Sequence, residues 1–118
     1  MENGKYEYDI KFHSQLGLKI GKCVWLINDN NAIGFLHIFG NSNKFSGIVT
    51  DDDTFTIQGT VSTLVRNFDF VGTGKMSENE IEFEIVDGSN VLKLIGKKTE
   101  VVNKWENFIQ KSSITKSW

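Results

Sequence analysis

Turn-forming residues recur along this chain at nearly even intervals and divide it into short segments. The turn signals are "NDNN" (28–31), "GNSN" (40–43), "DDD" (51–53), "SENE" (77–80) and "DGSN" (87–90). Short strands at spacings of about 8–12 residues predict an all-β sandwich or barrel. The predicted strands are 5–12, 18–27, 32–39, 44–50, 54–61, 63–75, 81–86 and 91–97. The connections after the second strand are too short for crossover helices, so we expect an antiparallel meander.

A weak internal repeat, an apolar residue followed by a variable residue and glycine, favours a closed barrel. It reads "FSGIV" (45–49), "IQGTV" (57–61), "FVGTG" (70–74) and "LIGKK" (94–98). The apolar residue and the glycine share one face, because side chains alternate along a strand. Glycines on the concave side permit sharp curvature, and closure removes exposed sheet edges.

We expect a single domain over residues 1–118, with the barrel at about 5–97 and one C-terminal helix at about 99–112. In "TEVVNKWENFIQK" (99–111) the apolar residues fall at helical spacing on one face. These residues are Val101, Val102, Trp105, Phe108 and Ile109.

Composition and charge exclude several classes of protein. The net charge is -2 with both signs interspersed, so the basic surface of a nucleic-acid-binding protein is missing. No apolar run is long enough for membrane insertion. The N-terminus has no signal-peptide pattern and Cys23 is the only cysteine, which favours a cytoplasmic location. A secreted domain trimmed of its signal peptide would read the same way.

Arg66 is the only arginine, and it lies in "STLVRNFDFVGTGK" (62–75), a segment that alternates like a strand. The predicted inner row is Leu64, Arg66, Phe68, Phe70, Gly72 and Gly74. A bulge between residues 66 and 68 would reverse this facing. A buried guanidinium needs a partner. Tyrosine hydroxyls with backbone carbonyls, solvent at the barrel mouth and an anionic ligand are the three alternatives.

The first functional hypothesis is a small barrel that binds an amphiphilic or carboxylate-bearing molecule in its interior. Arg66 would hold the anionic end through its fork of donors. The residues expected around the apolar part are Phe68, Phe70, Phe55, Phe83 and Tyr8. A small eight-stranded barrel has an interior that side chains just fill or that holds one small ligand.

The alternative hypothesis is a filled barrel that acts as a protein-interaction module of the inhibitor, immunity or adaptor type. The strand at 32–39 is apolar on both faces, so Ile33, Phe35 and Phe39 form an outer stripe that needs a cover. The C-terminal helix could supply that cover through Trp105 and Phe108. A protein partner or a second copy of the chain could supply it instead.

No catalytic or metal-binding constellation is apparent. His13 and His37 lack metal-ligand neighbours at useful spacing, and "DDD" (51–53) lacks the alternation of a calcium loop. Cys23 and His37 could form a nucleophile–base pair, but no third member or oxyanion hole accompanies them. We therefore expect neither an enzyme nor a cofactor.

Over residues 5–97 the chain resembles calycin-like small barrels, namely lipocalins, fatty-acid-binding proteins and avidins. The resemblance rests on the antiparallel meander and the recurring glycines. It implies an interior ligand, and an inward arginine that meets a ligand carboxylate, as in fatty-acid-binding proteins, would correspond to Arg66. The lipocalin glycine-x-tryptophan signature is absent, and "HSQLG" (13–17) has no room for a helical lid.

Overall fold

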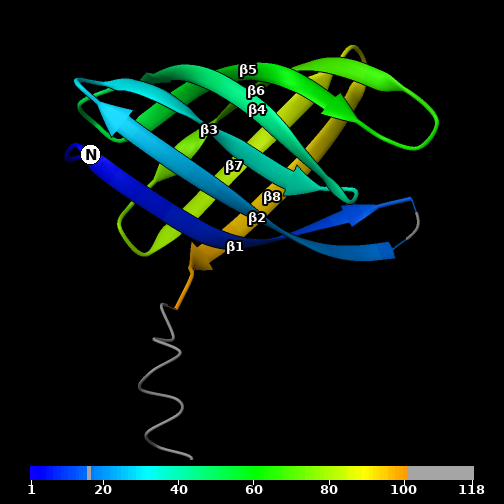
Figure 1. Ribbon diagram of the computed structural model, residues 1–118, viewed down its shortest axis with the longest axis horizontal. Helices are drawn as coiled ribbons and strands as arrows, with labels where there is room; N and C mark the ends of the chain where they lie inside the picture. The colour runs from blue at the N-terminus through cyan, green and yellow to red at the C-terminus, as the bar shows by residue number, and fades with distance from the viewer. Residues whose placement is uncertain (16, 101–118) are drawn as a thin grey trace, which may run out of the picture.

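The protein is a closed antiparallel β-barrel in the computed structural model, which describes residues 1–15 and 17–100. Its strands are β1 (Gly4–Ser14), β2 (Gly17–Asn28), β3 (Asn31–Ile38), β4 (Asn41–Val49), β5 (Thr54–Ser62), β6 (Asn67–Met76), β7 (Glu80–Asp87) and β8 (Asn90–Lys98). Each strand pairs with the next in sequence, and β8 pairs with β1 to close the barrel (Figure 1). The predicted eight-stranded meander is confirmed. The predicted helix at about 99–112 lies almost wholly outside the described residues.

Strict alternation decides which side chains form the core. Tyr8, Ile10 and Phe12 of β1 are buried, and the residues between them face solvent, as predicted. The predicted facing of β3, β5 and β7 is confirmed in the same way. Both faces of β2 carry one lysine and several apolar residues, so its sequence does not decide which face is buried. The buried row is Cys23, Trp25 and Ile27.

The inward glycines are covered by large side chains of neighbouring strands. A Cβ atom on Gly59 would lie 3.0 Å from the ring of Phe70, and one on Gly72 would lie 2.8 Å from Cγ1 of Ile57. Glycine therefore lets these side chains lie directly on the backbone of the next strand. The repeat curves the sheet and also fills the interior.

The connection between β5 and β6 corrects the predicted strand at 63–75. Strand pairing ends at Ser62 and Asn67, which leaves residues 63–66 as a loop. The backbone N–H of Thr63 donates to the carbonyl of Arg66 at 2.8 Å, and the Thr63 hydroxyl accepts from the Arg66 N–H at 3.2 Å. Leu64 and Arg66 are exposed in this turn, so their predicted place in the inner row is wrong. From Phe68 onward, β6 faces as predicted.

Candidate functional site

The barrel interior contains the aromatic residues that were predicted to line a cavity. Tyr8, Phe55 and Phe83 are buried. The ring of Trp25 lies 4.7 Å from the rings of both Phe45 and Phe55, and Phe55 lies 5.8 Å from Phe83. These rings contact one another in tilted and edge-to-face pairs, so the middle of the barrel is occupied by the protein's own side chains.

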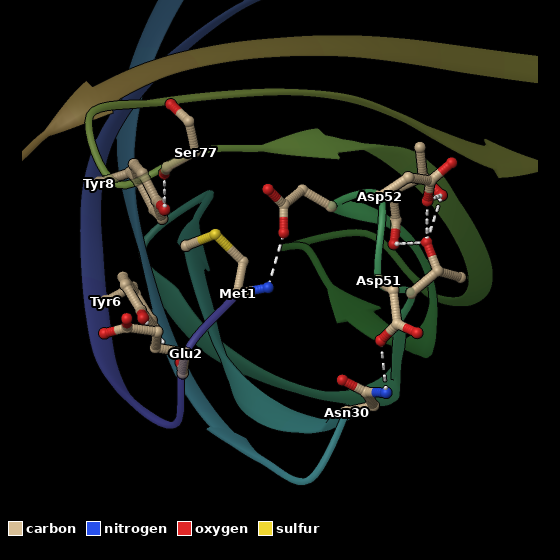
Figure 2. A network of polar contacts seen from close by, with 11 residues as sticks. Met1, Glu2, Tyr6, Tyr8, Asn30, Asp51, Asp52 and Ser77 are labelled. Carbon is tan, nitrogen blue, oxygen red and sulfur yellow. Dashed lines mark hydrogen bonds and ion pairs between the residues drawn. The ribbon is translucent and has the colours of Figure 1, made fainter.

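One end of the barrel is crossed by polar contacts within the chain. The Tyr8 hydroxyl donates to the carbonyl of Ser77 at 2.5 Å, and burial raises the pKa of this tyrosine. The amino group of Met1 lies 2.6 Å from Oδ1 of Asp53, and the Met1 side chain packs against the core. Figure 2 shows Met1 between the side that carries Tyr8 and the side that carries Asp52. The inward tyrosine hydroxyl is thus bonded to backbone and does not contact Arg66.

Arg66 contacts a carboxylate and a ring at the opposite end of the barrel. Its Nη2 lies 2.8 Å from Oδ2 of Asp87, and its guanidinium carbon lies 4.9 Å from the centroid of Phe68. The Arg66 side chain is 53% exposed. The guanidinium is therefore partnered at the surface, at the meeting of the β5–β6 loop with the end of β7.

The outer faces of β2 and β3 carry four apolar side chains in two directly opposed pairs. Leu26 faces Ile33, and Val24 faces Phe35. Leu26, Ile33 and Phe35 are 46%, 50% and 44% exposed, and Val24 is half-buried. Cross-strand pairs of this kind bring side chains within contact distance. We call these four residues the β2–β3 patch.

Polar and charged residues border the β2–β3 patch on both neighbouring strands. Lys5 and Glu7 of β1 lie opposite Leu26 and Val24, and they form an ion pair with each other at 3.0 Å. On β4, Lys44 lies opposite Phe35 and Ser46 lies opposite Ile33. The patch is thus an apolar centre with polar and charged residues on both sides of it.

Phe39 does not belong to this patch, although the sequence grouped it with Ile33 and Phe35. It follows β3 at a positive φ of 55°, in the turn before β4. Its ring packs edge-to-face on Phe12 at 5.4 Å. His37 continues the outer row of β3 instead, stacked on Phe35 at 6.2 Å with an interplanar angle of 18°.

Cys23 and His37 lie on opposite faces of the sheet and cannot act together. The Cys23 thiol points into the core, where it accepts a hydrogen bond from the Trp25 indole at 3.4 Å. Burial raises its pKa to about 12 from an ordinary value of 9.0, which keeps the thiol neutral. Within residues 1–15 and 17–100, no three His, Cys, Asp or Glu side chains gather closely enough to hold a metal ion.

An open groove of about 780 Å³ runs along the outside of the barrel over β1, β8 and β7. Five acidic residues and three lysines line it, namely Asp9, Asp52, Asp53, Glu80, Glu82, Lys11, Lys75 and Lys97. Charges of both signs therefore lie in the groove, and Nζ of Lys75 lies 4.0 Å from Oε2 of Glu82. The groove is open and mixes both charges, whereas the β2–β3 patch groups side chains of one chemical kind.

Comparisons with protein-family models, with curated proteins and with solved structures found no match for this chain. Among the residues that the structure describes, no helix is long and apolar enough to cross a membrane. Function is therefore inferred from the fold and the surface alone.

Proposed function

We propose that this chain is a filled β-barrel that works as a protein-interaction module, with the β2–β3 patch as its docking surface. The observation that carries the proposal is the pair of apolar contacts Leu26–Ile33 and Val24–Phe35 on the outside of the barrel. By contrast, the outer row of β5 is entirely polar. Grouped apolar side chains on a protein surface mark interaction sites more often than scattered ones do. A second outward group, Val71, Val86 and Val91, is opposed across β6, β7 and β8, but it contains no aromatic ring.

The chemistry of the patch defines the kind of partner that it fits. Phe35 offers a flat aromatic surface, and the aliphatic side chains around it exclude water when covered. A stable interface buries about 800 Å² on each partner, so the contact must extend onto the rim that includes Lys5 and Lys44. The partner surface is therefore an apolar segment with a polar or acidic border. A second copy of this chain or another protein could supply it.

A matched pair of variants tests the proposal. Ile33 and Ile95 are both outward-facing isoleucines, 50% and 59% exposed, but Ile95 lies between Lys11 and Glu82 rather than in an apolar group. A photo-crosslinking residue at position 35 should give a specific product, either a dimer or a partner adduct. Ile33→Ser should abolish that product, and Ile95→Ser should leave it unchanged. Equal loss in both variants, or a monomer with no product at position 35, would contradict the proposal.

Binding of an amphiphilic or carboxylate-bearing molecule in the interior stays a prediction. Arg66 lies outside the barrel, so an interior ligand would need another anchor, and it would have to displace rings such as Trp25 and Phe55. A rise in melting temperature with added fatty acids would support this second function. An unchanged melting temperature across a broad ligand panel would count against it.

The kinship with calycin-like barrels is likewise a proposal, supported by the eight-stranded closed meander and the inward glycines. The cytoplasmic location and the lack of enzymatic activity stay predictions from the sequence. Neither is needed for the docking proposal, which depends only on the β2–β3 patch.

A further inference from the structure

We propose that the partner of the β2–β3 patch is a second copy of this chain, and that the two copies meet about a two-fold axis parallel to the strands. The inference rests on the proposed function, because it names the occupant of the same surface. A two-fold contact uses one surface on both copies, so that surface must be complementary to itself. The β2–β3 patch and its rim meet this requirement.

Two rows of outward side chains cross the patch from β1 to β4. Each row consists of residues that are paired directly on neighbouring strands. The first row is Glu7, Val24, Phe35 and Lys44. The second row is Lys5, Leu26, Ile33 and Ser46. The first row therefore begins with an acid, ends with a base and is apolar between them.

A two-fold axis that runs between β2 and β3 reverses the order of each row in the second copy. When the two sheets pack face to face, β1 of one copy then lies over β4 of the other. Sheets that pack in this aligned way interdigitate their side chains across a gap of about 10 Å. Glu7 of each copy faces Lys44 of the other copy, and Val24 faces Phe35. Opposite charges thus meet at the rim while apolar side chains meet at the centre.

Lys44 distinguishes this arrangement from the other face-to-face two-fold. Within residues 1–15 and 17–100, Lys44 forms no ion pair, whereas Oε1 of Glu7 lies 3.0 Å from Nζ of Lys5. An axis perpendicular to the strands would place Glu7 opposite Lys5 of the other copy and Lys44 opposite Ser46. The parallel axis gives Lys44 a carboxylate and leaves Glu7 within reach of its own Lys5. Complementary charges of this kind fix the orientation of two partners.

The symmetry doubles the effect of each rim charge. One substitution changes two ion pairs in the dimer, because each contact occurs twice. A single exposed ion pair is weak, but a charge reversal turns two attractions into two repulsions. We expect such a reversal to raise the dissociation constant of the dimer about tenfold.

Charge reversal tests the arrangement in the purified full chain by sedimentation equilibrium. The parent chain should show a dimer whose fraction rises with concentration. Glu7→Lys and Lys44→Glu should each weaken it about tenfold. An equimolar mixture of the two variants should regain the parent affinity, because both rim contacts of the mixed dimer then join opposite charges. The perpendicular axis predicts no such recovery, since position 7 would face Lys5.

Glu84→Lys and Lys93→Glu form the matched control pair. These residues lie on the outer faces of β7 and β8, where Nζ of Lys93 lies 3.6 Å from Oε1 of Glu84. The two substitutions change the net charge in the same way as those at the rim. Neither variant, alone or mixed, should change the dissociation constant.

The outcomes separate this inference from the proposed function. A parent chain that stays monomeric, or a mixture that dimerises no better than the single variants, would overturn the two-fold contact. In either case, an adduct at position 35 with a different protein, lost in Ile33→Ser, would still support the docking surface. A dimer that responds to the control pair but not to Glu7→Lys, Lys44→Glu or Ile33→Ser would overturn both.

Discussion

Asn43 is the buried polar side chain that holds the β3–β4 hairpin to the end of β5, and its replacement by alanine should be costly. It is 3% exposed. Its Nδ2 donates to the carbonyl of Leu36 at 2.9 Å, and its Oδ1 accepts from the N–H of Ser62 at 2.9 Å. Each such bond contributes about 1 kcal/mol net, rising to about 1–3 kcal/mol where its loss leaves a buried partner without a bond. We expect Asn43→Ala to lower the free energy of unfolding by about 2–4 kcal/mol.

Urea denaturation measures this loss, and Asn41→Ala provides the control. Asn41 also donates to a carbonyl, that of Ser62 at 2.9 Å, but it is exposed, so water can replace its bonds. Its replacement should cost less than about 1 kcal/mol. For a domain of this size, the Asn43 variant should melt about 10 °C or more below the parent chain. If the two variants lost the same free energy of unfolding, the larger cost expected for Asn43 could not be attributed to burial of its amide.

Three further outcomes follow from the packing and the charges. Gly34→Ala would place a Cβ against the carbonyl oxygen of Val24 and 2.6 Å from Cζ of Phe45, so thermal unfolding should show a loss of about 1–3 kcal/mol. Arg66→Leu removes a solvent-exposed ion pair and a ring contact, so it should cost less than about 1.5 kcal/mol and cost still less in 1 M salt; a stabilising effect would indicate a buried charge. The raised pKa of Cys23 means that the unfolded chain loses its thiol proton first, so stability should fall as pH rises from about 9 to 12, and less steeply in Cys23→Ala.

The fold could be predicted because turn residues and alternation both act locally. Asp87, Gly88 and Asn90 lie at the β7–β8 hairpin, and the alternation of Ile81, Phe83 and Ile85 fixed the facing of β7. The loop at 63–66 was wrongly predicted as part of a strand, and the reason is also local. It is formed by the hydroxyl and backbone of Thr63, without glycine or asparagine to mark it, and the apolar residues within it imitate a strand.

The candidate site was only half predictable, because it needs the facing of β2. Ile33 and Phe35 were identified from the position of Gly34. Val24 and Leu26 were missed, although Gly21 lies on the inward row of β2 and would have placed both outward. The apolar–variable–glycine repeat does not hold in β2, because Lys19 occupies the position at which the other strands carry an apolar residue. For the facing of β2, the position of Gly21 was therefore more informative than the identity of Lys19.

The outward apolar side chains of β2 and β3 are not needed to form the core of the barrel. Trp25 and its neighbours already supply these strands with a buried face, so the outward Leu26 and Phe35 add nothing to the core. Exposed on a free barrel, they favour association with whatever apolar surface is near. The outer face of β5 carries threonines and a glutamine, so the barrel accommodates polar residues at positions of this kind. The proposed docking surface gives these outward side chains a physical role that packing of the barrel does not.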